Sequence, residues 1–503
     1  MRLELKRIIS TFLWHGIFRR LEPKARPVAG HALTLHKSVA VSAETRRRWS
    51  HVPWPAAAIV AWSAVAWVCL APVQTSASGI NTERQGVPHK SFSPGPVNAR
   101  TRYIHEAAVA VGYLVRHYWA GSPRRGHIRC SWNGYPGGGL VLKGVYPPLW
   151  ERGMMIFAMA NLYQATGNPI LKRRLRAEWS WIKAHYPPGI LETAGNGFQP
   201  ECDDCGWNAL TLLTFHKVLG NRRPLQYAAH LVASAFQRWL DNKFGGGMWY
   251  NDARKDKSLY QVGIVLSALK IYEATGNRAL YRKAMACYQW MESHLLRPDG
   301  LYWCDYGRTG PVGKNRPNDI HQAGSVTYIG GNMGMGVIQA TLYGMTNQKA
   351  YRRRAIRVAV AIAKRLTRNG VYLDDRDAWT DGSFAGEWAT KVLTLRGIKK
   401  EQRKILYRTA NSIYHHDRTL DDFYGGCWGG PAGGPGCRWC MVGSLPQQIM
   451  TSSSAVNLIT AAALLQRAYL PLSERGARNT FTGNHACGSG MAGPHQTVLT
   501  RAQ

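Results

Sequence analysis

The stretch NLYQATGN at residues 161–168 recurs as TFHKVLGN at 214–221, as KIYEATGN at 270–277 and, in weaker form, as TLYGMTN at 341–347. In the first three copies an apolar helix-like stretch ends at Gly-Asn, and a basic amphipathic stretch follows. Glycine favours the left-handed conformation that ends helices, so each copy predicts the end of one helix and the start of another. A helix hairpin of this kind cannot bury its apolar side alone and has to stack on its neighbours.

The repeat therefore predicts an all-α fold. The helix before each stop is rich in Ala, Leu and Met on all sides, which indicates an inner position covered by protein all round. The helix after each stop carries Arg and Lys, which indicates an outer position. About six such pairs fit between residues 101 and 470, ending in a strong helix at 453–468. We predict an (α/α)6 barrel of helix hairpins.

The 503 residues divide into five predicted segments. Residues 1–51 form a basic extension, and 52–77 carry no charge and form a signal-peptide core or a membrane anchor. Residues 78–100 are a linker, 101–470 the barrel, and 471–503 a disordered tail. We expect an exported protein that is secreted, periplasmic or at the cell surface, with retention by the N-terminal anchor left open.

The formal net charge is +35, from 64 Lys and Arg against 29 Asp and Glu. Such a chain is attracted to anionic cell-wall polymers or membrane surfaces. No zinc-finger, RNP or Walker motif accompanies the charge, so no specific nucleic-acid partner is expected.

Ten cysteines are present, and in an exported protein some should pair as disulfides. Cys202 and Cys205 bracket a pair of aspartates, and Cys437 and Cys440 repeat the spacing. A disulfide that stiffens the aspartate pair is our favoured hypothesis, with structural zinc as the alternative.

Acidic residues are scarce, so the adjacent pair Asp203-Asp204 in PECDDCGWNALTLL (200–213) stands out ahead of an apolar helix. At the first turn of a helix both carboxylates can reach one cleft. A retaining glycosidase needs two carboxylates about 5–5.5 Å apart, one to attack the anomeric carbon and one to donate a proton. The alternative is ordinary helix capping, which position alone favours.

The words around this pair resemble a known family. DDCGWNAL is similar to the Asp-Asp-x-x-Trp-Trp-Ala-Leu signature of glycoside hydrolase family 76, the α-1,6-mannanases, which are retaining enzymes on an (α/α)6 barrel. Further words of the family follow in the right order across residues 101–470, and these are FGGGMWY (244–250), GNMGMG (331–336), DGSFAGEW (381–388) and WGGP (428–431).

The resemblance implies an enzyme that cleaves or transfers an α-mannan polysaccharide, with Asp203 as nucleophile and Asp204 as general acid/base. It implies no cofactor and no metal, and we expect a monomer. The residues expected to bind substrate are Trp207, Asn208, Trp249, Asn332, Asp381 and Trp428. For each tryptophan alone, packing in the core is the alternative.

Three positions depart from the family pattern. Asn208 stands where a second tryptophan is common, Met333 replaces a polar residue, and Ala385 replaces a lysine. Two other functions stay open, the first because of the basic surface and the second because of these departures. One is a different (α/α)6 enzyme acting on acidic polysaccharide, and the other is a non-catalytic glycan-binding protein of the cell wall.

Overall fold

The computed structural model describes residues 101–129, 149–186, 188–192, 201–254, 256–307, 310–311, 329–373, 382–419, 422–430 and 445–470. Every helix in these ranges lies between Arg102 and Ala468. The segments predicted at 1–51, 52–77, 78–100 and 471–503 lie outside the described residues and stay predictions.

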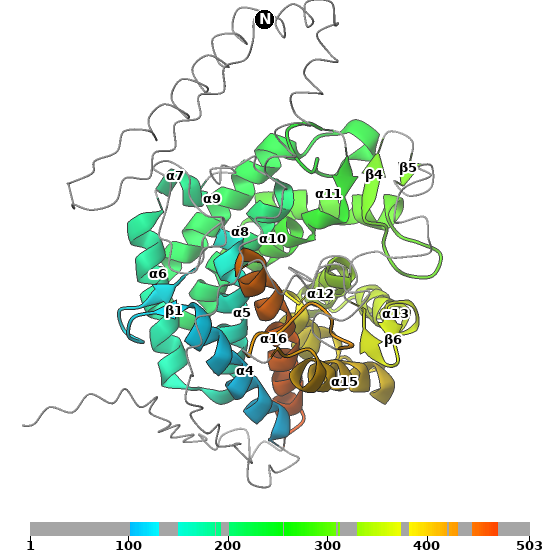
Figure 1. Ribbon diagram of the computed structural model, residues 1–503. Coiled ribbons are helices and arrows are strands. Elements are labelled where there is room, and N and C mark those ends of the chain that lie inside the picture. The colour runs from blue at the N-terminus through cyan, green and yellow to red at the C-terminus, as the bar shows by residue number, and fades with distance from the viewer. Residues whose placement is uncertain are drawn as a thin grey trace, which may run out of the picture. The chain divides into compact units, whose positions relative to one another are not determined.

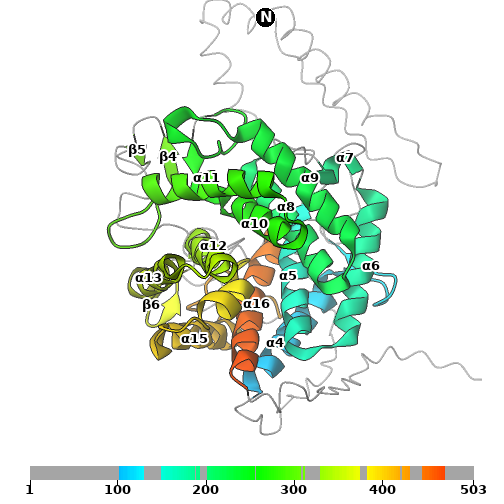
Figure 2. The ribbon, with the colours of Figure 1, turned by 180° about the vertical axis from the view of Figure 1, so that it is seen from behind.

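Six helical elements form an inner ring in which each contacts the next, and the last contacts the first (Figures 1 and 2). They are α5 (Leu149–Thr166), α8 (Cys202–Leu219), α10 (Val262–Thr275), α12 (Ile329–Thr346), the short α14 (Ala385–Glu387) continued by the π-helical η5 (Trp388–Val392), and α16 (Leu445–Ala468).

Six further helices alternate with these along the chain and cover the ring from outside. They are α4 (Arg102–Tyr118), α6 (Pro169–His185), α9 (Arg222–Trp239), α11 (Arg278–His294), α13 (Lys349–Arg365) and α15 (Lys400–His416). The predicted (α/α)6 barrel of helix hairpins is confirmed.

Short elements occupy the connections between helices. The strands pair antiparallel as β1 (Trp119–Ala120) with β2 (His127–Ile128), β4 (Asp305–Gly307) with both β3 (Lys257–Ser258) and β5 (Gly310–Pro311), and β6 (Thr367–Arg368) with β7 (Val371–Tyr372). Three short helical segments complete the described elements, and these are α7 (Pro188–Glu192), η2 (Lys243–Gly245) and η3 (Leu259–Gln261).

The Gly-Asn repeat makes the turn between inner and outer helices. Gly167, Gly220 and Gly276 have φ values of 71°, 69° and 72°, the left-handed region that the repeat predicts. The asparagine that follows caps the next helix, as when Asn168 Oδ1 accepts the Ile170 N–H at 2.9 Å. In the fourth copy Asn347 takes the left-handed conformation instead of glycine, at φ 54°. One dipeptide thus ends one helix and starts the next.

The inner helices are buried on nearly all sides, whereas the outer helices bury one face. The clearest case is Ile449–Ala468 in α16, which is long and apolar enough to cross a membrane yet is 94% buried within the barrel. Its composition reflects protein on every side, which is the position that the sequence predicts for an inner helix.

Helices α8 and α10 touch backbone to backbone near the start of α8. A Cβ added at Gly206 would lie 2.9 Å from the Gly263 Cα, and one added at Gly263 would lie 3.0 Å from the Gly206 Cα. Contacts this short cannot be relieved by rotating a side chain, so the two helix axes would have to separate.

We therefore expect Gly206→Ala to lower the free energy of unfolding by roughly 1–3 kcal/mol. The control is Gly112→Ala in α4, where an added Cβ meets nothing within 4 Å and alanine favours the helix by about 0.5–1 kcal/mol. Urea unfolding of the two variants measures both effects. An unchanged free energy of unfolding in Gly206→Ala would contradict the close contact between Gly206 and Gly263.

Candidate active site

The two adjacent aspartates lie in the first turn of α8, and both side chains are half-buried. The start of this helix is attached to the neighbouring loop, because the Cys202 N–H donates to the Tyr250 carbonyl at 2.8 Å. Asp203 Oδ1 accepts the Asp204 N–H at 2.9 Å. The positive end of the helix dipole favours negative charge at this turn. The structure thus fixes two acids at one helix start.

A third carboxylate borders the pair. Glu201 precedes α8 with extended backbone, and its Oε2 accepts the Tyr250 hydroxyl at 2.6 Å. The same hydroxyl lies 3.4 Å from Asp203 Oδ2. Burial and the negative charges of Asp203 and Glu201 raise the pKa of Tyr250 well above its ordinary value, so this hydroxyl keeps its proton. Tyr250 therefore connects the two acids through one hydroxyl group.

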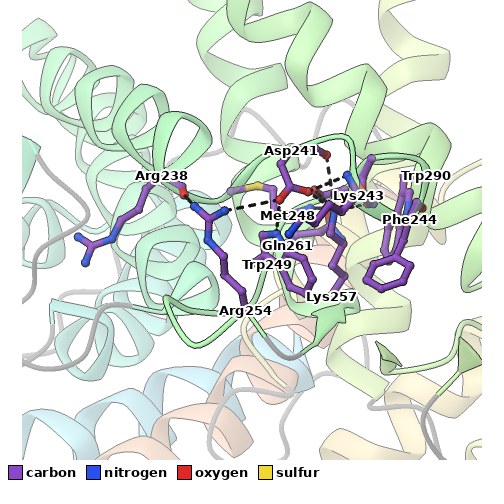
Figure 3. Close-up of polar contacts among 12 residues, drawn as sticks. Arg238, Asp241, Lys243, Phe244, Met248, Trp249, Arg254, Lys257, Gln261 and Trp290 are labelled. Atoms are coloured by element: carbon purple, nitrogen blue, oxygen red, sulfur yellow. Dashed lines mark hydrogen bonds and ion pairs between the residues drawn. The ribbon is translucent and has the colours of Figure 1, made fainter. Parts of the chain in front are cut away.

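The loop that carries Tyr250 is held by a buried lysine (Figure 3). The Lys257 side chain is fully buried, and its Nζ donates to Asp241 Oδ1 at 2.8 Å. It also donates to backbone carbonyls of the glycine-rich turn, among them Lys243 O at 2.7 Å and Gly247 O at 3.1 Å. Asp241 in turn accepts the Trp249 indole N–H. One ammonium group therefore fixes the whole turn that leads to Tyr250.

Lys257→Met should lower the free energy of unfolding by roughly 3 kcal/mol, because it leaves Asp241 and several carbonyls without their donor. The matched control is Lys243→Met, whose side chain is exposed, and which should change stability by less than about 0.5 kcal/mol. Chemical denaturation of both variants provides the comparison. Equal losses of stability in the two variants would contradict the role of Lys257 in holding the glycine-rich turn.

A fourth acid, on the neighbouring inner helix, interacts electrostatically with Asp204. Glu151, in the first turn of α5, is 1% exposed. Burial raises its pKa to about 7, with Asp204 contributing in the same direction and Arg152 opposing. Arg152 is engaged elsewhere, in a buried ion pair with Glu178 at 2.7 Å. Among the described residues nothing donates a hydrogen bond to Glu151 Oε2.

This raised pKa makes stability depend on pH. The folded protein holds the Glu151 proton up to about pH 7, while the unfolded chain releases it near 4.5. The neutral Glu151 side chain therefore contributes to the free energy of unfolding below pH 4.5, and this contribution is lost as the pH rises through 7. The free energy of unfolding of Glu151→Gln, taken relative to that of wild type, should rise by on the order of 3 kcal/mol from pH 4 to pH 8. Denaturant unfolding of both proteins at these two pH values tests it, and a gap that does not vary with pH would contradict it.

The three tryptophans expected at the sugar are packed side chains. Trp207, Trp249 and Trp428 expose 6%, 4% and 0% of their surfaces. The Trp207 ring lies against Phe384 with centroids 4.9 Å apart, and the Lys257 ammonium lies 4.9 Å from the Trp249 ring. This burial favours the packing alternative, and sugar stacking by any of the three stays a prediction.

The remaining substrate-binding candidates are placed as follows. Asn332 is fully buried, and its Oδ1 accepts the Tyr302 N–H at 2.9 Å, which is a structural contact. Asn208 is 7% exposed and borders a small cavity together with Leu149 and Tyr186. Asp381 lies outside the described residues. Met333 and Ala385, two of the departures from the family pattern, are fully buried.

The cysteine hypothesis requires a correction. Cys202 and Cys205 are both free and buried, so no disulfide joins them or stiffens the aspartate pair. The first turn of α8 is closed instead by the Cys205 N–H, which donates to the Glu201 carbonyl at 3.2 Å. Cys427 is disulfide-bonded. In the described ranges no group of His, Cys, Asp and Glu could hold a metal ion.

A cavity of about 270 Å³ lies toward the other end of α8. Its charged lining includes Lys217, Lys270, Lys391 and Glu387. Burial would raise the pKa of Glu387, but Lys270 and Lys391 hold it at about 2. Since Lys217 and Asp203 are 14 residues apart on one helix, they are separated by roughly 20 Å along its axis. The cavity is therefore not part of the site around the aspartates.

Sequence reasoning did not single out Glu151, Glu201 or Tyr250. Glu151 and Arg152 interrupt an otherwise apolar inner helix, and that pair of charges was an available signal. For Tyr250 only its place in the glycine-rich word was readable. Its contact with Glu201 spans 49 residues and depends on how the loop folds back onto α8.

The closed ring of helix hairpins places the chain in the class of (α/α)6 helical barrels. The family model for glycosyl hydrolase family 76 matches residues 104–413. The chain belongs to this family, which supports glycoside hydrolase activity. No curated protein sequence matches the chain.

Solved structures show the same fold. An inactive variant of the α-1,6-mannanase GH76A of Salegentibacter sp. HEL1_6, with two adjacent aspartates replaced and α-1,6-mannotriose bound, is 18% identical with a TM-score of 0.56, covering 72% of this chain and 99% of that one. The GH76 α-mannanase BT2949 of Bacteroides thetaiotaomicron is 16% identical, with a TM-score of 0.55 and coverage of 73% and 96%. Dfg5 of Chaetomium thermophilum, in complex with glucosamine, is 14% identical, with a TM-score of 0.52 and coverage of 73% and 91%.

Proposed function

We propose that this chain cleaves, or transfers, α-1,6-linked mannose polymers by a retaining double displacement. Asp203 acts as the nucleophile and Asp204 as the general acid/base. The observation that carries the proposal is the adjacent pair in the first turn of inner helix α8, half-buried and held in place by the Tyr250 loop. The complex of a related α-1,6-mannanase with α-1,6-mannotriose supports the choice of substrate.

The surroundings of the two acids suit different roles. Asp203 accepts a backbone N–H at the helix start, where the helix dipole favours the ionised carboxylate, and this is the form that attacks the anomeric carbon. Asp204 interacts with the buried Glu151, and the general acid/base role of Asp204 follows from its place in the family signature. In the first step Asp204 protonates the leaving oxygen while Asp203 forms the glycosyl ester. In the second step Asp204 removes a proton from water or from an acceptor hydroxyl, and the ester is broken.

Asp203→Asn should lower the turnover of α-1,6-mannan oligosaccharides by at least about 10³-fold, because the amide cannot form the covalent intermediate. Product mass spectrometry measures the loss, and circular dichroism checks that the variant is folded. Asp299→Asn, which alters an aspartate paired with Arg297 after α11, should keep activity. Full turnover by folded Asp203→Asn would refute the assignment.

The roles of the two acids can be separated with azide and an aryl α-mannoside substrate. In Asp203→Ala, azide attacks the sugar directly and should give the inverted β-mannosyl azide. In Asp204→Ala, azide attacks the covalent intermediate and should give the retained α-mannosyl azide. The opposite pattern would exchange the two roles.

One observation favours a second substrate class. The net charge of +35 suits an anionic glycan, so another (α/α)6 activity on acidic polysaccharide is the alternative. Product from uronate polymers and none from mannosides would establish it, whereas binding to mannan without product would indicate a non-catalytic glycan-binding protein.

We further propose that the protein acts outside the cytoplasm, as a monomer on cell-wall or membrane-associated glycan. The disulfide at Cys427 supports an oxidising compartment. The apolar segment predicted to direct export or to anchor the chain lies outside the described residues.

A further inference from the structure

The site holds an arrangement that retaining chemistry does not by itself require, and it consists of one hydroxyl shared between two carboxylates. The Tyr250 oxygen lies 2.6 Å from Glu201 Oε2 and 3.4 Å from Asp203 Oδ2. A hydroxyl has a single proton and donates strongly to one acceptor at a time. The distances show that Glu201 receives this hydrogen bond in the resting protein, at a length typical of a charge-assisted bond.

The loop and the helix start hold these groups together in several ways. The Cys202 N–H donates to the Tyr250 carbonyl at 2.8 Å, and Asn251 pairs with Glu201 as an antiparallel bridge. The Tyr250 side chain is half-buried and packs against Tyr260, with ring centroids 5.5 Å apart. The hydroxyl can therefore change its acceptor by rotating the O–H bond, without any movement of the backbone.

The charge on Asp203 changes during the proposed reaction, while the charge on Glu201 does not. Asp203 is an anion before attack, a neutral ester in the intermediate, and an anion again after release. A hydrogen bond from Tyr250 to Asp203 would weaken it as a nucleophile in the first step and stabilise it as a leaving group in the second. Competition from Glu201 limits the weakening of Asp203 as a nucleophile in the first step. It still permits the stabilisation of Asp203 as a leaving group in the second step.

We propose that Glu201 and Tyr250 are positioning residues that divide one hydrogen bond between the two steps of catalysis. Before attack, the Tyr250 hydroxyl donates its hydrogen bond to Glu201 and not to Asp203. As the glycosyl ester breaks, the same hydroxyl donates a hydrogen bond to the departing Asp203 carboxylate. This inference rests on the proposed function of Asp203 as nucleophile. It adds two residues to the site, and it assigns them opposite effects on the two steps.

The test compares Glu201→Gln with Tyr250→Phe by steady-state and pre-steady-state kinetics on an aryl α-1,6-mannobioside. Glu201→Gln replaces the anionic acceptor with a weaker neutral amide oxygen, so the Tyr250 hydroxyl should donate to the anionic Asp203 instead and the first step should slow. We expect kcat/KM to fall roughly tenfold with no burst of aryl product. Tyr250→Phe removes the donor that the leaving carboxylate needs, so the second step should slow. We expect kcat and KM to fall together by roughly tenfold, with kcat/KM nearly unchanged and a burst of aryl product.

The matched control is Tyr302→Phe. Tyr302 donates to Glu292 over the same 2.6 Å, in a pair formed by α11 and the chain that follows it. Its loss should reduce stability without producing a burst or separating kcat from kcat/KM. A structural role alone for Tyr250 would give this same result, so the burst distinguishes the two explanations.

The outcomes separate this inference from the function on which it rests. If wild type turns over the substrate and Asp203→Asn does not, but Glu201→Gln and Tyr250→Phe slow the same step, the shared hydrogen bond is refuted and the proposed function stands. If wild type gives no product from mannosides, the proposed function fails, and this inference fails with it. Opposite effects of the two variants support both.

Discussion

Helix α16 packs against α5, the first inner helix, and this contact between the two ends of the barrel closes the ring. Both helices are apolar on nearly all sides, so neither has a face that can meet water. An open row of hairpins would leave the outer side of each terminal inner helix exposed. Closure removes both exposed edges at once, and the remaining packing follows from it.

The site depends on this closure because its acids come from neighbouring inner helices. Glu151 is in the first turn of α5, and Asp203 and Asp204 are in the first turn of α8. The backbone contact of Gly206 with Gly263 brings the next helix, α10, close to the same turn. Acidic side chains thus gather at the starts of two neighbouring inner helices.

A second level of support comes from outside the ring. The Lys257 ammonium holds the glycine-rich turn, and that turn presents Tyr250 to Glu201 and Asp203. None of these contacts is made within a single helix. The geometry of the nucleophile is consequently set by a loop that a buried charge keeps in one conformation.

The sequence by itself determined the all-α class, the helix junctions and the position of the aspartate pair. These features are local, since a Gly-Asn stop acts through the φ angle of one residue and the cap made by the next. The resemblance to the family motifs predicted the barrel and the roles of the aspartates in more detail than hydrophobic periodicity alone.

Only the tertiary structure decided which side chains surround the aspartates. The cysteines beside them are free, the three tryptophans are packed, and Glu151 and Tyr250 reach the pair from elsewhere in the chain. Burial, hydrogen bonding and a raised pKa depend on neighbours brought together by packing, and spacing along the sequence does not encode these distances.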